Sequence, residues 1–340
     1  MLLETTCTSL FQEIVNNLKW TPLKRNTVID ITKAIGILLV ILGHCGAMPY
    51  RHFIFTFHMP LFFILSGYFF KSKDIKTSMK SDLQHLMIPY FVTCGAVVLL
   101  TSVKSMISRD FSPVFYYVEA TFFGSGSPHS CQYLAYLPSI GAIWFFPALL
   151  VCKNVYNALS CYPVKKRLLF SAIIYVVATL IGRYIIFIPF SVLCGLSAII
   201  FYAIGDYYKK EKPQIKWIYW IVGLFCWGIS SMFSIVLLVQ PRTDLYLIDV
   251  IGATTATFMV YKISAKISKL FPKSDLLPWI GRNTIYILCF HLIDLDLGVS
   301  NMITHNMYPV TLIMSMLIIP LVATFVWTMA YRRWMRPFGF

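Results

Sequence analysis

The sequence has little charge. Only 13% of its 340 residues are Asp, Glu, Lys or Arg, against roughly 25% in ordinary soluble domains. Hydrophobic residues make up 58% of the chain, and the mean hydropathy is +0.71. This composition excludes a soluble enzyme and a disordered chain. A polytopic helical membrane protein is the class that it favours.

Acidic residues are especially scarce. The net charge of +15 comes from 29 Lys and Arg against 14 Asp and Glu. A nucleic-acid-binding protein gets its positive charge from abundant Lys and Arg, whereas here the shortage of acids contributes to the excess. The composition therefore excludes that class, and we expect no nucleic-acid partner.

The sequence also shows neither a motif of paired cysteines nor the pattern of a signal peptide. No CxxC and no Cys/His cluster with metal-ligand spacing occurs, so neither a disulfide framework nor a metal centre is expected. Residues 1–27 contain no apolar stretch that ends in a small-residue cleavage site, so we expect no signal peptide. No internal repeat of the kind found in inverted-repeat transporters is seen.

Long apolar segments make up most of the sequence. Ten can be marked, at about 28–48, 52–70, 86–107, 139–157, 168–187, 189–208, 215–239, 245–265, 280–298 and 308–331. Most have the ~20 residues that cross a bilayer. The sequence thus predicts an all-α polytopic membrane protein with about ten transmembrane helices. We expect a cytoplasmic N-terminal segment (1–27, with an interfacial helix near 10–18), a ten-helix membrane domain (28–331) and a basic cytoplasmic tail (332–340).

The distribution of Lys and Arg predicts the orientation. With both termini in the cytoplasm, 23 of the 29 basic residues fall on the inner side, as the positive-inside rule requires. The outer side then holds only Arg51, Lys104, Arg109, Arg183 and Arg242. The largest loop, 108–138, is expected outside. The protein is therefore predicted to be a multi-pass protein of the inner or plasma membrane.

Three histidines lie inside apolar segments. His44 lies eleven residues after Lys33, roughly 16 Å along a helix, and His291 lies nine residues after Arg282, roughly 13 Å. His58 is expected roughly 9 Å below the outer surface, where Pro60 is expected to bend the helix. Ionisable groups at such depth mark functional sites by default. Similar depth in three helices favours one polar cavity, in which an imidazole suits the role of general base.

Less specific interpretations stay open for these residues. Each histidine alone could be a satisfied core residue, and three histidines could bind zinc, although they come from three separate segments without an i, i+4 pair. Lys33 can pair with Asp30 one turn away or extend to the inner surface. Ser66 and the glycine after it allow a close helix approach or a backbone break.

Five stretches carry a family resemblance. They are DITKAIGILLVILGH (30–44), FHMPLFFILSGYFFK (57–71), LMIPYF (86–91), IGAIWFFPALL (140–150) and IGRNTIYILCFHL (280–292). Together they resemble the membrane-bound acyltransferase type 3 family, and within it the fucose 4-O-acetylase-like branch. Lys33 and His44 fall on the family's motif of a basic residue, ten residues and a histidine. Many members have Arg at the first position, and a basic cluster before the third span is reduced here to Lys80 and His85.

The resemblance implies an activity and its partners. Such proteins move an acyl group, usually acetyl from acetyl-CoA, to a hydroxyl of an envelope polysaccharide or lipid-linked sugar. No cofactor is bound permanently. His44 would be the general base or an acyl carrier, with Lys33 and Asp30 as its catalytic partners. The expected substrate-binding residues are His58, His291, Ser66 and Asn283, and the expected CoA-binding residues are Lys71, Lys80 and Arg282.

Two other functions remain open at this point. A polar cavity at mid-depth also suits a transporter or flippase of a lipid-linked glycan. Histidine chemistry alone would suit a pH sensor without catalytic activity. The absence of repeats and the specific opening motifs favour the acyltransferase.

Overall fold

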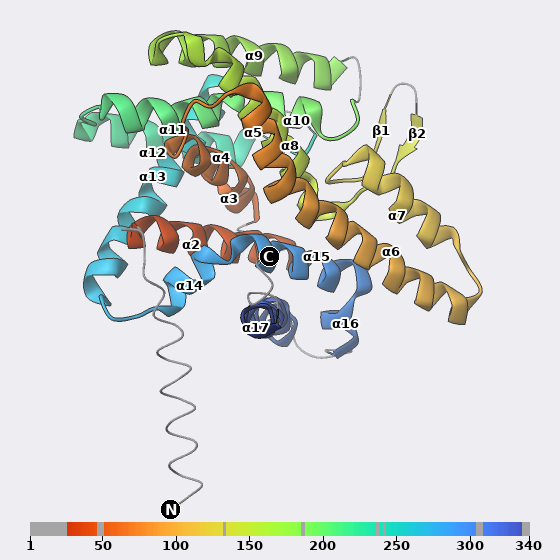
Figure 1. Cartoon of the computed structure of the whole chain (residues 1–340). Coiled ribbons are helices and arrows are strands. Elements are labelled where there is room, and N and C mark those ends of the chain that lie inside the picture. Colours follow the sequence, from red (N-terminus) through yellow and green to blue (C-terminus); the bar gives the residue numbers. More distant parts are fainter. Residues whose placement is uncertain are drawn as a thin grey trace, which may run out of the picture.

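The protein is almost wholly helical (Figure 1). The computed structural model describes residues 26–45, 51–131, 134–184, 188–234, 238–240, 243–303 and 309–334. Within these ranges the sheet structure is one antiparallel pair, β1 (His129–Cys131) and β2 (Leu134–Leu137). The all-α architecture that the composition predicts is therefore confirmed.

The first half of the chain forms the following elements: α2 (Thr27–His44), α3 (Arg51–Phe55), α4 (His58–Tyr68), α5 (Ile75–Asp82), the π-helical turn η1 (Leu83–Met87), α6 (Ile88–Ser108), α7 (Ser112–Phe123), β1, β2, the 3₁₀ turn η2 (Gly141–Trp144) and α8 (Phe145–Ala158). The second half forms the 3₁₀ turn η3 (Leu159–Cys161), α9 (Val164–Tyr184), α10 (Val192–Ser197), α11 (Ile199–Glu211), α12 (Trp217–Phe233), α13 (Leu247–Leu270), α14 (Leu276–Arg282), α15 (Thr284–Leu297), α16 (Val299–Ile303) and α17 (Pro309–Trp334).

Helix α2 lies at the centre of the assembly. It begins at Thr27, where the side chain of Asn26 accepts a hydrogen bond from the amide of Val28 and so satisfies one of the free N-terminal donors. Its contacts include α3, α4, α13, α14, α15 and α17. The approach to α14 is close, because a Cβ at Gly281 would overlap the backbone carbonyl of Asp30. The position therefore requires glycine.

Among the described residues, five helical segments are long and apolar enough to cross a membrane, and a sixth span results if α14 and α15 are counted together. Many large apolar side chains of α6, α12 and α17 are exposed, among them Leu99, Phe225 and Trp327. Such surfaces suit hydrocarbon rather than water. The membrane character is confirmed, whereas the number of ten spans and the cytoplasmic termini stay predictions.

Three of the expected spans are interrupted, one of which, 189–208, divides into α10 and α11 at Ala198. The segment 52–70 divides into α3 and α4 at Thr56 and Phe57. Pro60 was expected to bend this helix but lies in the first turn of α4, where a missing amide breaks no helical hydrogen bond. The segment 280–298 includes a 77° bend between α14 and α15. The distance from Arg282 to His291 is therefore not a straight helical rise.

The expected interfacial helix at 10–18 lies outside the described residues, as do most of the N-terminal segment and the end of the basic tail.

Candidate active site

His44 lines a pocket of about 310 Å³ at the end of α2. We call it the His44 pocket. Its polar lining residues are His44, Arg51, His58, Ser127 and Gln240. Its apolar lining comes from Val40, Phe55, Met59, Gly126, Pro128, Ala142, Trp144, Leu238 and Val239. Residues from α2, α3, α4 and the loop after α7 thus meet here, although they are far apart in the sequence.

The hydrogen bonds of two imidazoles fix which nitrogen carries the proton. Nδ1 of His44 lies 2.7 Å from the carbonyl oxygen of Val40, and Nδ1 of His58 lies 2.9 Å from that of Ile54. A carbonyl oxygen only accepts hydrogen bonds, so Nδ1 is the donor in both rings. Nε2 of each neutral ring then keeps its lone pair. Each of these two lining residues therefore keeps one nitrogen that can accept a proton.

His291 lies directly against His44. The two ring centroids are 5.3 Å apart and the ring planes make an angle of 66°. His291 is fully buried on α15, and neither of its ring nitrogens has a hydrogen-bond partner among the described residues. A buried polar group without a partner costs free energy. His291 is absent from the lining of the His44 pocket and instead supports the His44 ring.

Phe55 connects the other two histidines. Its ring centroid lies 4.9 Å from that of His58 and 6.1 Å from that of His44. The guanidinium of Arg51 also lies 4.8 Å from the Phe55 centroid. Phe55 therefore holds two imidazoles and one cation around a single aromatic ring.

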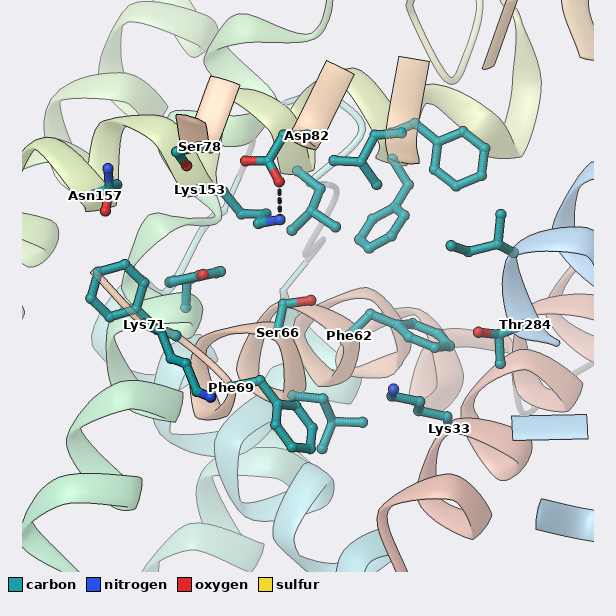
Figure 2. A pocket seen from close by; sticks show the side chains of 18 of the residues that line it. Lys33, Phe62, Ser66, Phe69, Lys71, Ser78, Asp82, Lys153, Asn157 and Thr284 are labelled. Atoms are coloured by element: carbon teal, nitrogen blue, oxygen red, sulfur yellow. Dashed lines mark hydrogen bonds and ion pairs between the residues drawn. The ribbon is translucent and has the colours of Figure 1, made fainter. Parts of the chain in front are cut away.

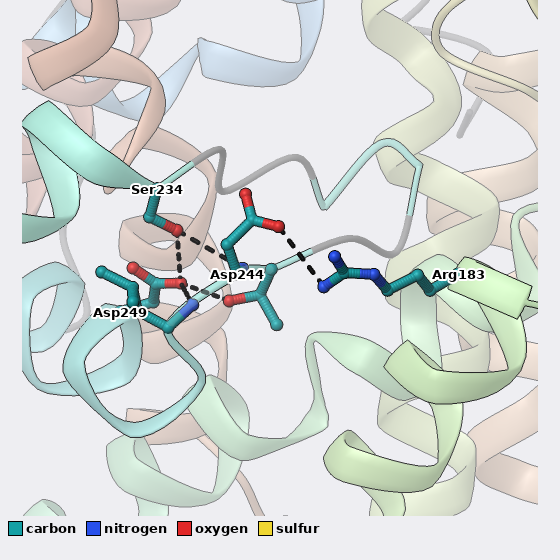
Figure 3. A network of polar contacts seen from close by, with 6 residues as sticks. Arg183, Ser234, Asp244 and Asp249 are labelled. Atoms are coloured by element: carbon teal, nitrogen blue, oxygen red, sulfur yellow. Dashed lines mark hydrogen bonds and ion pairs between the residues drawn. The ribbon is translucent and has the colours of Figure 1, made fainter.

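A buried carboxylate holds the segment that completes this pocket (Figure 3). Asp249 accepts hydrogen bonds from the hydroxyls of Ser230, Ser234 and Thr243 and from the amide of Leu245. These groups lie on both sides of residues 238–240, which line the pocket. Two further contacts secure the segment: Arg183 forms an ion pair of 3.4 Å with Asp244, and the Gln240 amide donates a 2.7 Å hydrogen bond to Ser127.

A second pocket, of about 390 Å³, lies near the start of α2 (Figure 2). We call it the Lys33 pocket. Four lysines line it: Lys33, Lys71, Lys73 and Lys153. Ser66, Phe69, Phe70, Asp82 and Asn157 are also in its lining. The ammonium group of Lys33 lies 5.6 Å from the ring centroid of Phe69. Four cations against one carboxylate suit a polyanionic ligand.

The walls of the Lys33 pocket are fixed by contacts between distant segments. The Asn157 amide donates to the carbonyl of Lys73 (2.9 Å), and its oxygen accepts from the Lys73 amide (3.1 Å). Lys153 forms an ion pair with Asp82, which Figure 2 shows across the pocket from Lys33. Asp82 is followed at once by η1, and π-helical turns occur frequently at functional sites.

A buried ion pair lies behind the Lys33 pocket. The guanidinium of Arg167 donates to Asp206 at 2.6 Å, and the Tyr156 hydroxyl donates to the same carboxylate at 2.8 Å. Arg167 also lies 5.3 Å from the ring centroids of both Phe70 and Tyr156. Because Phe70 lines the pocket, this network holds one of its aromatic walls in place.

The expected site residues divide into three groups. His44 and His58 share one pocket, with His291 in contact with His44. Lys33, Ser66 and Lys71 share the other pocket, so Ser66 lies with the lysines and not with His58. The remaining expected residues are absent from the lining of both pockets: Asp30, Lys80, Arg282 and Asn283.

Asn283 has a local structural contact. Its side-chain amide donates to the carbonyl of Trp279 at 2.8 Å, where the chain bends between α14 and α15. Its neighbours Thr284 and Ile285 do line the Lys33 pocket. Within the described ranges, no three His, Cys, Asp or Glu side chains converge to form a possible metal site.

Sequence reasoning missed several lining residues. Lys73, Asp82 and Lys153 were not singled out for the Lys33 pocket, and Arg51 and Gln240 were not singled out for the His44 pocket. In the sequence, Lys73, Lys153 and Arg51 contribute only to the distribution of basic residues that predicts the orientation. No spacing in the sequence signals the pairing of Asp82 with Lys153.

Comparison with known families identifies the domain. Residues 26–332 match the model of the acyltransferase domain. No curated protein and no solved structure matches the chain. The matched range contains both pockets and every described helix except the last residues of α17.

Proposed function

Because the chain belongs to the acyltransferase-domain family, we propose that it is a membrane O-acetyltransferase. In this proposal acetyl-CoA donates an acetyl group to a hydroxyl of an envelope polysaccharide or lipid-linked sugar. The donor is bound in the Lys33 pocket and the acceptor in the His44 pocket. The family match favours this chemistry over transport of a glycan. Assignment to the fucose 4-O-acetylase-like branch remains part of the proposal.

The donor site is proposed from charge. CoA carries a diphosphate and a ribose phosphate, and the Lys33 pocket presents four lysines with aromatic rings beside them. Lysine binds phosphate as a point charge. In the ten-span topology with cytoplasmic termini, the start of α2 faces the cytosol, where acetyl-CoA is found. The Lys153–Asp82 pair adds a cation whose position is fixed by a partner on another helix.

The chemical step is proposed for Nε2 of His44. As the acceptor hydroxyl attacks the thioester carbonyl, its proton passes to Nε2, a C–O bond forms and the C–S bond breaks. The proton then passes to the departing CoA sulfur. The Nδ1–H bond to the Val40 carbonyl holds the ring in the required tautomer and favours the imidazolium that forms. An acyl-imidazole intermediate on Nε2 is the alternative covalent route.

One observation carries this proposal. His44 presents a lone-pair nitrogen at a pocket, with its other nitrogen held by a backbone carbonyl and a second buried imidazole behind the ring. His291 is then a positioning residue, and His58 supplies a second Nε2 that can orient the acceptor by accepting a hydrogen bond from one of its hydroxyls.

The test uses reconstituted protein, radiolabelled acetyl-CoA, and glycan extracted from the envelope of the cells in which the protein naturally occurs. We expect His44→Ala to lower transfer by roughly 100-fold or more, since general-base catalysis supplies about 10²–10⁴-fold. His52→Ala is the matched control, because His52 is exposed and absent from both pocket linings. Equal transfer by His44→Ala and His52→Ala at equal amounts of folded protein would refute the assignment.

A further inference from the structure

The His44 pocket has an uneven charge. Arg51 contributes a guanidinium to its lining, whereas no Asp or Glu occurs among the lining residues that the structure describes. The nearby buried carboxylates have other partners. Asp249 accepts four hydrogen bonds from its own segment, and Asp294 accepts from the amide and hydroxyl of Ser300. No ion pair to Arg51 is found within the described ranges.

Arg51 is close to the groups that would carry out the transfer. Its guanidinium lies over Phe55, and the same ring contacts His44 and His58. The cation and the two imidazoles are thus grouped around one aromatic ring. Arg51 and His44 also line the same pocket, so one ligand in it can contact both side chains.

The remaining lining suits a sugar ring. Trp144 and Phe55 offer aromatic surfaces, and Ser127 and Gln240 offer a hydroxyl and an amide that are already connected by a hydrogen bond. Polar groups at fixed positions among aromatic side chains are typical of small-molecule sites. The pocket thus combines features for a carbohydrate with a single cation.

We propose that the acceptor is an anionic sugar, whose carboxylate or phosphate is bound by Arg51 while a hydroxyl of the same molecule lies at His44. This inference rests on the proposed function, in which the His44 pocket takes the acceptor. Arginine matches both anions because its planar guanidinium donates two parallel hydrogen bonds. A neutral sugar of the same shape leaves the guanidinium without this partner.

Binding of three probes tests the charge preference: glucuronic acid, glucose 1-phosphate and glucose. The protein is placed in nanodiscs of zwitterionic phosphatidylcholine without acetyl-CoA, and dissociation constants are measured by saturation-transfer NMR titration. We expect at least one anionic sugar to bind about tenfold more tightly than glucose, the lower end for a charge-assisted hydrogen bond. The comparison of the two anions distinguishes a uronate acceptor from a sugar phosphate.

Variants assign the preference to Arg51. In Arg51→Gln the ratio of anionic to neutral affinity should fall toward one, and Arg51→Lys should restore part of it. Arg109→Gln is the matched control, because it removes an exposed arginine that is absent from the pocket lining. Arg51 is itself exposed, so its replacement leaves no buried group unpaired, and size-exclusion chromatography confirms folding.

Three results would overturn the inference: no preference for either anion, no detectable binding of either anion, or an unchanged preference in Arg51→Gln. The last is also the result expected if Arg51 only contacts lipid headgroups. The assay contains no acyl donor, so it is independent of catalysis. Anion binding without acetyl transfer would overturn the proposed function alone, and acetyl transfer without anion preference would overturn this inference alone.

Discussion

Replacing His291 by leucine should make the protein more stable and less active. His291 is fully buried, and both of its ring nitrogens lack a hydrogen-bond partner among the described residues. An unsatisfied buried polar group costs about 1–3 kcal/mol. Leucine has a similar volume and no polar atom, so His291→Leu should raise the free energy of unfolding by about that amount. An unchanged free energy of unfolding would contradict this account of His291.

The loss of activity has a separate physical cause. The His291 ring contacts that of His44 at a centroid distance of 5.3 Å, and its removal frees His44 to leave the orientation set by the Val40 carbonyl. Contacting residues in one network show coupling energies of about 0.5–3 kcal/mol. We therefore expect His291→Leu to lower the transfer rate by about tenfold, with little change in KM for acetyl-CoA.

The assay is a double-mutant cycle of rates per folded molecule, with thermal unfolding measured in the same detergent. His44→Ala should cost about 10²–10⁴-fold alone, and His291→Leu should add little to it, because residues that act as a unit are not additive. His58→Ala should behave in the same way. Full specific activity of His291→Leu would show that His291 is not part of the site. Losses of rate that multiply independently in the double variants would refute a site shared by these histidines.

Three more predictions follow from the pockets and the topology. Lys33→Met should raise KM for acetyl-CoA, whereas Lys33→Arg should keep activity because the charge is retained; equal kinetics of both variants would assign Lys33 to structure. Asp249→Asn weakens the acceptor of four hydrogen bonds and should cost about 2 kcal/mol in thermal stability; an unchanged melting curve would contradict this. In intact cells an impermeant maleimide should label Ser112→Cys but not the exposed native Cys161; labelling of Cys161 would overturn the orientation.

The all-helical membrane class could be predicted from composition, and two contacts among the expected site residues agree with their expected depth. His44 and His291 were placed at similar depth from residue counts alone, and the structure brings their rings into contact. Lys33 and Lys71 were expected near CoA, and they share a pocket. Helical rise is regular within α2, so the distance from Lys33 to His44 can be read from their spacing, whereas the bend before α15 makes the rise counted from Arg282 to His291 inexact.

The interruptions and cross-helix contacts could not be predicted. Apolar residues continue through Thr56 and Phe57, so hydropathy does not show the end of α3. Asp82 and Lys153 are 71 residues apart, and their pairing depends on how α5 packs against α8. Gln240 reaches its pocket because Asp249 fixes the surrounding segment. These features come from tertiary packing, which one sequence without relatives does not reveal.

The eleven-residue spacing between Lys33 and His44 relates the positions of the two pockets along α2. Eleven residues make about three full turns of an α-helix, so both side chains lie on the same face of α2, roughly 16 Å apart. Gly36 and Val40 lie between them on that face. Val40 lines the His44 pocket, and a Cβ at Gly36 would come within 3.0 Å of the Phe62 ring. If the donor is held at Lys33 and the base is His44, the acetyl group has to travel along this stripe. The same Cβ would come within 2.9 Å of the Leu61 side chain, and the Phe62 ring is in turn held against Phe145 at a centroid distance of 5.9 Å. In the proposed function, α2 therefore sets the distance between the donor and acceptor pockets, and Phe62, in the lining of the Lys33 pocket, packs against this face at Gly36.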